Sequence, residues 1–142
     1  MLASSSWGLV ALLALGFRVL AANPFHAQAF YQRGLANRRL GKSSEARRDL
    51  ARAAELHNLV AEMDRLNREA GKNPDDPEIR SQLGRICVAL GKPELAASWY
   101  VAALACDPRH PGAKLGLKAL GREDLIRHPT RHLPTALAVN GG

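Results

Sequence analysis

The sequence predicts an all-α protein: an α-solenoid of stacked antiparallel helix pairs with an apolar helix at its N-terminus. Apolar residues recur at helical spacing along most of the 142 residues, as in helices that bury one face. A shift of 50 residues aligns one part of the chain with another, which indicates a repeat architecture. Aromatic residues make up only 5%, and this argues against an all-β fold because strands favour aromatic and β-branched side chains.

Residues 1–22 form an apolar N-terminal segment. No polar side chain interrupts Trp7–Phe17, so a helix here is apolar on every face instead of along one stripe. We consider three interpretations: a membrane anchor or uncleaved signal sequence, a cleaved signal peptide, and a helix packed on the next helix pair. As a helix, Met1–Phe17 would be about 25 Å long, slightly short of a bilayer core, and the first six residues lack the basic side chain of a typical signal peptide. The first two interpretations slightly favour a membrane-associated or cell-envelope location over the cytoplasm.

The repeat consists of two helical copies. Each copy spans 34 residues and contains two apolar stripes at helical spacing, separated by a Leu-Gly-Lys turn. Gly41 and Gly91 end the first helix of each copy, because glycine adopts the left-handed backbone conformation at little cost. The shift matches Gln32, Gly34, Leu40-Gly41-Lys42, Ala46 and Ala53 with Gln82, Gly84, Leu90-Gly91-Lys92, Ala96 and Ala103.

The repeat divides the chain into six segments. The first copy has Asn58 where the second has Pro108, so its second helix either continues or kinks near His57. A lone helix after the second copy would cover the last apolar face, as the ends of a repeat array require. The predicted segments are an apolar helix (1–22), the first repeat (23–58), an extra helix or helix extension (59–73), the second repeat (74–108), a capping helix (109–121) and a mostly unstructured tail (122–142).

Small residues are expected where the two helices of each copy cross. Gly34 and Gly84 lie on the first helices, and Ala46 and Ala96 lie on the second. Their small side chains would let the helices approach closely. We expect Gly34 to face Ala46 and Gly84 to face Ala96, with Tyr100 filling the space beside the second contact.

This arrangement of small and apolar positions resembles the tetratricopeptide repeat, a 34-residue helix–turn–helix module. The resemblance covers roughly residues 23–121, and two copies in phase make it specific. It implies a non-enzymatic scaffold for protein–protein interaction, which would hold a partner peptide or helix in the concave groove lined by the first helix of each pair. The structural repeat positions are Gly34, Ala46, Ala53, Gly84, Ala96, Tyr100, Ala103 and Pro108.

The resemblance also implies which residues line the groove. Arg38, Arg39 and Arg85 would present a basic strip, and guanidinium groups pair well with carboxylates. A protein or peptide partner, in particular an acidic one, would suit this strip. The chaperone-binding branch of the family clamps a terminal carboxylate with a Lys and an Asn, but Tyr31 and Leu35 stand at those positions. The predicted groove residues are Gln28, Tyr31, Leu35, Arg38 and Arg39 from the first copy, and Glu78, Ser81, Arg85 and Val88 from the second.

The sequence contains no motif that indicates catalysis or metal binding. It has neither a phosphate-binding glycine-rich loop nor a His-Glu-x-x-His or Gly-x-Ser-x-Gly motif. We therefore predict no catalytic residue, metal site, cofactor or small-molecule substrate.

The net charge of +7 would suit nucleic acid, but Glu45, Asp49 and Glu55 lie among the arginines at spacings that favour pairing within a helix, so nucleic acid is the less favoured partner. An accessory fragment of a larger repeat assembly is a third alternative.

Overall fold

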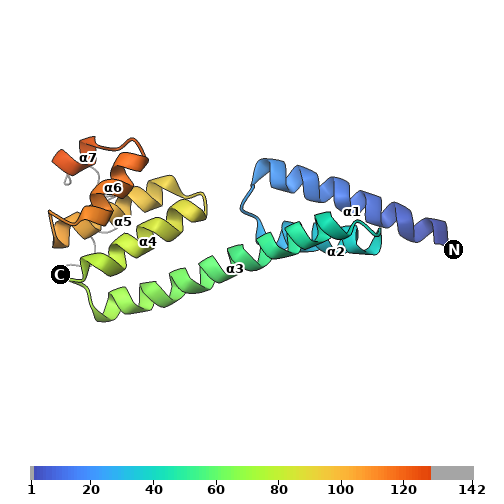
Figure 1. The fold of residues 1–142 in the computed structure, drawn as a ribbon, viewed down its shortest axis with the longest axis horizontal. Coiled ribbons are helices and arrows are strands. Elements are labelled where there is room, and N and C mark those ends of the chain that lie inside the picture. Colours follow the sequence, from blue (N-terminus) through green and yellow to red (C-terminus); the bar gives the residue numbers. More distant parts are fainter. Residues whose placement is uncertain (1, 129–142) are drawn as a thin grey trace, which may run out of the picture. The chain divides into compact units, whose positions relative to one another are not determined.

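The computed structural model describes residues 2–128, and this part of the chain contains seven α-helices and no strand (Figure 1). The predicted all-α class is therefore confirmed. The chain forms two compact units, Met1–Val60 (unit 1) and Ala61–Gly142 (unit 2), and helix α3 contributes residues to both. The helices are α1 (Leu2–Ala22), α2 (Ala27–Arg39), α3 (Ser43–Lys72), α4 (Pro77–Ala89), α5 (Pro93–Cys106), α6 (Pro111–Ala119) and α7 (Asp124–Arg127).

Helices α2, α4 and α6 begin with the same local structure. Each follows an Asn-Pro or Asp-Pro turn, and the side chain at its N-cap accepts a backbone N–H from the first turn. Nδ1 of His26 accepts from the N–H of Ala29 at 3.1 Å, and Nδ1 of His110 accepts from that of Ala113 at 3.2 Å. In α4 the carboxylate of Asp76 has this role. The three helices are therefore started by equivalent caps.

The same three helices also end alike. Gly41, Gly91 and Gly121 follow their last turns with φ of +75°, +70° and +68°, a conformation that favours glycine. In each case the residue after the glycine donates its backbone N–H to the carbonyl five residues earlier, at 2.8–2.9 Å. Helix α6, with nine residues against thirteen in α2 and α4, is thus built like the first helix of a further pair.

Helix α1 packs against α2 in unit 1. Among residues 6–22 of this helix, the buried ones are Leu13, Gly16 and Leu20. A Cβ on Gly16 would lie 3.3 Å from the Cβ of Arg33, so the two helices approach closely at this point. In the structure this segment is a helix packed on α2.

None of the helices within residues 2–128 combines the length and the hydropathy that crossing a membrane requires.

Helix α3 is one continuous helix of 30 residues. The segment predicted as an extra helix or an extension, residues 59–73, is therefore an extension as far as Lys72. Leu56 in unit 1 and Leu66 in unit 2 are both 1% exposed. Each half of this helix thus contributes a fully buried leucine.

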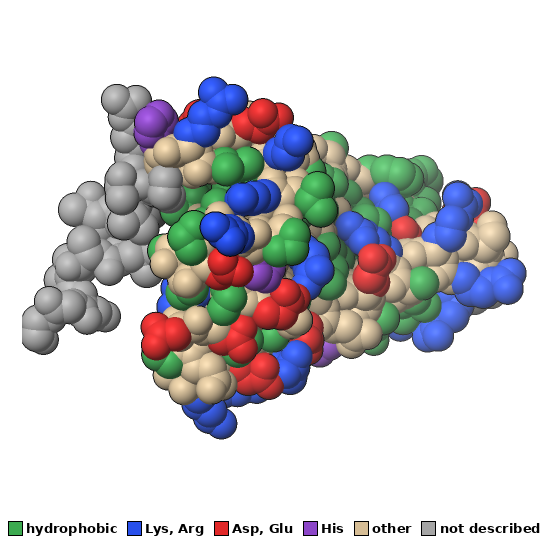
Figure 2. All heavy atoms as spheres, turned by 60° about the vertical axis from the view of Figure 1, so that its left-hand side comes forward, with side chains coloured by type: hydrophobic (Ala, Val, Ile, Leu, Met, Phe, Trp, Pro, Cys, Tyr) green, Lys and Arg blue, Asp and Glu red, His purple; other side chains and the backbone are tan. Residues whose placement is uncertain are grey.

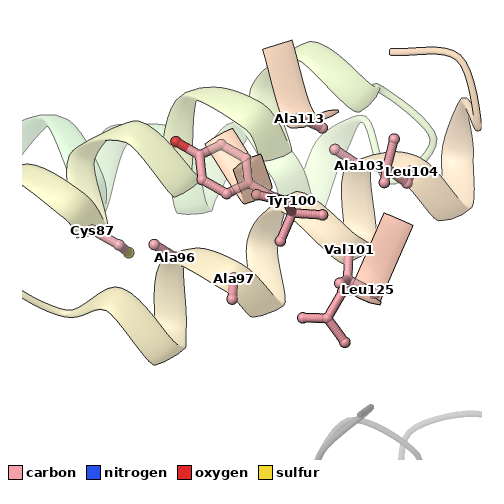
Figure 3. Packing of buried hydrophobic residues seen from close by; sticks show 10 residues of the cluster. Cys87, Ala96, Ala97, Tyr100, Val101, Ala103, Leu104, Ala113 and Leu125 are labelled. Atoms are coloured by element: carbon pink, nitrogen blue, oxygen red, sulfur yellow. The ribbon is translucent and has the colours of Figure 1, made fainter. Parts of the chain in front are cut away.

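The core of unit 2 lies between α4, α5, α6 and α7 (Figure 3). Tyr100 of α5 is 2% exposed, and its ring contacts two glycines. A Cβ on Gly84 of α4 would lie 2.5 Å from the ring of Tyr100. A Cβ on Gly116 of α6 would lie 2.3 Å from the same ring. These glycines therefore make room for the aromatic ring between two helices.

Helix α7 belongs to the same core. Its Leu125 is 2% exposed and packs in the cluster around Tyr100. The predicted tail, residues 122–142, thus starts with a helical turn that is part of the fold. Residues 129–142 lie outside the described part of the chain.

A side chain larger than the predicted alanine lies nearest to each of the two repeat glycines. The side chain nearest to a Cβ on Gly34 is Leu50, at 2.8 Å, and the one nearest to a Cβ on Gly84 is Tyr100. A larger side chain thus fills the space that each glycine leaves. The alanines expected at these contacts lie four residues earlier and are buried: Ala46 and Ala96.

Candidate partner-binding site

An open groove of about 460 Å³ lies between α2 and α3 in unit 1. Two of the predicted groove residues, Gln28 and Tyr31, line it from α2. Tyr31 is 46% exposed, so a partner can reach its ring. The other lining residues, which the sequence did not place in a groove, are Ala27, Leu50, Ala53, Ala54, His57 and Asn58.

The remaining predicted residues of the first copy lie outside this lining. Leu35 is half-buried in α2. Arg38 and Arg39 are exposed in the last turn of the same helix, where positive charge is favourable because of the helix dipole. Both guanidinium groups are therefore at the surface of unit 1.

The 50-residue repeat identifies the corresponding place in unit 2. Tyr31 and Leu50 correspond to Ser81 and Tyr100, and both are buried because α6 packs across α4 and α5. Ser81 is fully buried, with its Oγ 3.0 Å from the position of a Cβ on Gly112 of α6. The prediction that Ser81 lines a partner groove is therefore wrong. The groove of unit 1 is the place that α6 fills in unit 2.

The other predicted residues of the second copy, Glu78, Arg85 and Val88, are exposed on α4. Arg85 pairs with Glu78 at 2.8 Å, and Nε2 of His110 lies 3.1 Å from the other carboxylate oxygen of Glu78. Hydrogen bonds from Gln82, His110 and Arg85 lower the pKa of Glu78 below its ordinary value. The positive charge of Arg85 is thus partly neutralised within unit 2.

Charge is distributed unevenly between the two units. Unit 1 has eight Lys and Arg against three Asp and Glu, a net charge of +5, whereas unit 2 has twelve against ten, a net charge of +2. Figure 2 shows acidic side chains among the basic ones on the face that it displays. The open groove therefore belongs to the more basic unit.

Unit 1 also contains a buried polar cluster between α2 and α3. Arg33 donates to both carboxylate oxygens of Asp49, at 2.6 and 2.7 Å, and Nδ2 of Asn37 donates to the same carboxylate at 3.3 Å. The hydrogen bond to Asp49 raises the pKa of Arg33, and its guanidinium lies 4.8 Å from the ring centroid of Phe17. Asp49, expected to pair within its helix, thus pairs across helices and fixes their register.

A tetratricopeptide repeat family model matches residues 11–59 and 64–111, more than half of the chain. The chain belongs to the tetratricopeptide repeat family. Repeats of this family generally mediate contacts between proteins, and the family typically consists of non-enzymatic scaffolds. No curated protein and no solved structure matches the chain.

Both matched parts of this tetratricopeptide repeat protein begin in the helix that precedes a first helix: α1 and the second half of α3. The 50-residue repeat extends equally far back. Leu9-Val10-Ala11 recurs as Leu59-Val60-Ala61, and Asn23-Pro24 recurs as Asn73-Pro74. Helix α1 therefore corresponds to the second half of α3 and takes the position of the second helix of a preceding pair. This match could have placed residues 1–22 in the repeat from the sequence.

Proposed function

We propose that this protein is a scaffold that binds a helical segment of a partner protein in the groove between α2 and α3 of unit 1. One observation carries the proposal: the equivalent place in unit 2 is filled by α6 of the chain itself, whereas in unit 1 it is open. A helix pair in a repeat array is completed by the helix of its neighbour. The lining of the groove can contact such a helix, and we propose that the groove binds a partner without catalysing a reaction.

Helix α6 indicates what the bound segment looks like. Ala113 and Leu117 form its buried face, and Gly116 leaves room for the ring of Tyr100. Unit 1 has the smaller Leu50 in the place of that tyrosine, so alanine or a larger apolar side chain of the partner would fill the space. The polar lining residues, which could hydrogen-bond to the partner, are Gln28, His57 and Asn58.

The charge of unit 1 favours an acidic segment. Unit 1 carries +5, and Arg38 and Arg39 are exposed at the end of α2. Exposed ion pairs contribute only about 0.2–1 kcal/mol each, so apolar contacts in the groove would supply most of the affinity. The acidic residues would mainly accelerate association and make it sensitive to salt.

Two synthetic peptides test the proposal with the full chain. One copies residues 108–121, which contain α6, and the other has the same sequence with Lys114→Glu and Lys118→Glu. We expect both to shift the amide resonances of the groove in the isotope-labelled protein, above all those of Tyr31 and Ala54. The acidic peptide should bind more tightly, and salt should reduce this difference.

Matched variants locate the binding. Ala54→Arg places a long charged side chain in the groove at an exposed position, and it should abolish the shifts without unfolding the protein. Ala51→Arg adds the same charge to the same helix outside the groove, and it should leave binding unchanged. The proposal is wrong if neither peptide shifts the groove resonances, or if both variants weaken binding equally.

A further inference from the structure

The side of α1 that faces away from its buried residues is apolar and exposed. Trp7 is 75% exposed and Leu15 is 57% exposed, and contiguous apolar surface of this kind usually marks an interaction site. Ala11 and Ala14 lie between them, so an uncharged stripe extends along the helix as far as Arg18. The outer stripe of α1 is defined here as Trp7, Val10, Ala11, Ala14 and Leu15.

The second half of α3 shows that the fold does not require an apolar stripe at this position. It corresponds to α1 in the repeat, with His57 and Arg65 at the positions of Trp7 and Leu15. Arg65 forms an ion pair with Glu62 at 2.5 Å on this exposed surface. The repeat fold therefore accepts charged residues at these positions. The fold alone does not explain why α1 has exposed apolar residues there.

Helix α5 shows what an apolar helix of this fold looks like when it is covered. It packs against α4, α6 and α7. Its six buried residues together cover nearly half of the helix circumference, and they are Ala96, Ala97, Tyr100, Val101, Ala103 and Leu104. Helix α1 has a similarly apolar composition, but its outer stripe is exposed. The comparison indicates that α1 has the composition of a helix that is covered on more of its surface than α2 alone covers.

We propose that a second copy of the chain covers the outer stripe, with the two α1 helices antiparallel. An uncharged stripe is self-complementary, since a two-fold axis brings no like charges together along it. The antiparallel arrangement also separates the two Arg18 side chains, which a parallel arrangement would bring together. With Ala11 on the axis, Trp7 of each copy lies opposite Leu15 of the other. Gly8, with open space where a Cβ would be, permits a close approach.

The area of the exposed side chains fits a reversible dimer. The apolar side chains on the outer side of α1 would bury about 500 Å² per copy, given that a fully buried aromatic residue contributes roughly 150–250 Å². The total of about 1,000 Å² lies at the lower limit for a specific interface. Because each copy carries +5 in unit 1, added salt should strengthen the dimer by screening the repulsion.

Sedimentation equilibrium of the full chain over a wide concentration range tests the proposal. The double variant Trp7→His/Leu15→Arg carries the residues that α3 has at the same repeat positions, so it suits the fold. We expect it to weaken dimerisation by about tenfold or more, because it buries a charge in an apolar interface. Its circular dichroism should match that of the wild type. Leu115→Arg is the control, because Leu115 is 67% exposed on α6 and should not affect the dimer.

Disulfide crosslinking tests the orientation. In a Cys106→Ser background, the thiol introduced by Ala11→Cys should crosslink two copies. The thiol introduced by Arg18→Cys should not, because two such residues would lie about 20 Å apart along an antiparallel pair. Crosslinking at Arg18→Cys would contradict the antiparallel arrangement.

Three results would overturn the proposal: a wild-type chain that stays monomeric, a dimer that the double variant leaves intact, or a monomer that floats with phosphatidylcholine vesicles. The last result would assign the stripe to lipid. None of the outer-stripe residues lines the groove between α2 and α3, so this proposal and the proposed function fail independently.

Discussion

Unit 1 and unit 2 contain the same kind of helix pair, but the chain completes it differently in each. In unit 2 the second helix ends at Cys106 and the Asp107-Pro108 turn leads directly to α6, which buries Tyr100 to 2% exposure. In unit 1 Asn58 replaces that proline, α3 continues, and Tyr31 is 46% exposed. The same repeat surface is thus core in one unit and an open groove in the other, depending on whether the next helix follows directly.

The contact between the two helices of each pair differs in chemistry as well. Unit 1 holds its pair with the buried ion pair between Arg33 and Asp49. At the corresponding positions unit 2 has Leu83, which is fully buried, and Trp99, which packs against the core. The contact between two helices can therefore be filled by apolar packing or by a hydrogen-bonded ion pair. The ion pair stabilises the contact only while both residues are present, because removing one leaves the other charge unpaired.

The largest expected effect comes from removing the central side chain of each pair. Tyr100→Ala should destabilise unit 2 by about 3–5 kcal/mol, because it leaves a cavity between three helices. Leu50→Ala, at the same position of unit 1, should cost only about 1 kcal/mol because Leu50 is half-buried. Hydrogen exchange of the amides in each unit measures both free energies of opening. Equal losses would contradict the distinction between a closed and an open pair.

The ion pair of unit 1 should give the next largest effect. Asp49→Ala leaves the Arg33 guanidinium without its partner, and we expect a loss of about 2–3 kcal/mol in unit 1 with no change in unit 2. Arg33→Leu combined with Asp49→Trp, which copies unit 2, should restore part of that stability. Denaturant unfolding monitored by unit-specific resonances checks this result, and a double variant weaker than Asp49→Ala would argue against equivalence of the positions.

Adding a methyl group to the glycines should give a smaller effect that differs between the units. A Cβ on Gly84 would meet the ring of Tyr100 at 2.5 Å, so Gly84→Ala should cost about 1–2 kcal/mol after its gain in helix propensity. Gly34→Ala should cost less than Gly84→Ala because the half-buried Leu50 can move part of the way aside, although the Cβ of Asp49 also lies 3.2 Å from the added Cβ. Thermal unfolding of both variants provides the comparison, and a larger loss for Gly34→Ala would contradict it.

The smallest expected effect is a dependence on pH that arises in unit 2. The pKa of Glu78 is lowered below 4.5 in the folded protein, so its ion pairs contribute stability above about that pH, and the contribution is lost as pH falls through the folded-state pKa. Since the Glu78 side chain is half exposed, we expect no more than about 0.5 kcal/mol. Glu78→Gln should remove this part of the acid sensitivity in urea unfolding at pH 3 to 6, and an unchanged profile would exclude the contribution.

The sequence predicts the local parts of this fold well. The turns at Gly41 and Gly91 can be predicted from the few residues around each glycine. A glycine at the end of a helix readily adopts the positive φ that these turns have. The continuation of α3 was one of two alternatives, because the absence of a proline at Asn58 permits a long helix without requiring it. Local sequence therefore determines where helices end more clearly than what they contact.

The groove and the ion pair depend on how helices cross, which the sequence does not specify to within a turn. The repeat pattern predicts Ala46 beside Gly34, but it does not show that Leu50 lies nearest to this glycine or that Asp49 pairs with Arg33 across the helices. Ser81 was misplaced for a related reason: α6 covers it, and only the three-dimensional packing identifies that cover. The role of α1 was recoverable, because the 50-residue repeat already reaches Leu9.

Thiol reactivity at one matched pair of positions tests most directly whether one unit is open and the other closed. In a Cys106→Ser background, Tyr31→Cys and Ser81→Cys place thiols at the same repeat position of unit 1 and unit 2. We expect a maleimide to react with the first at close to the rate of a free thiol, and with the second only when α6 moves away. Similar rates at both positions would contradict the account.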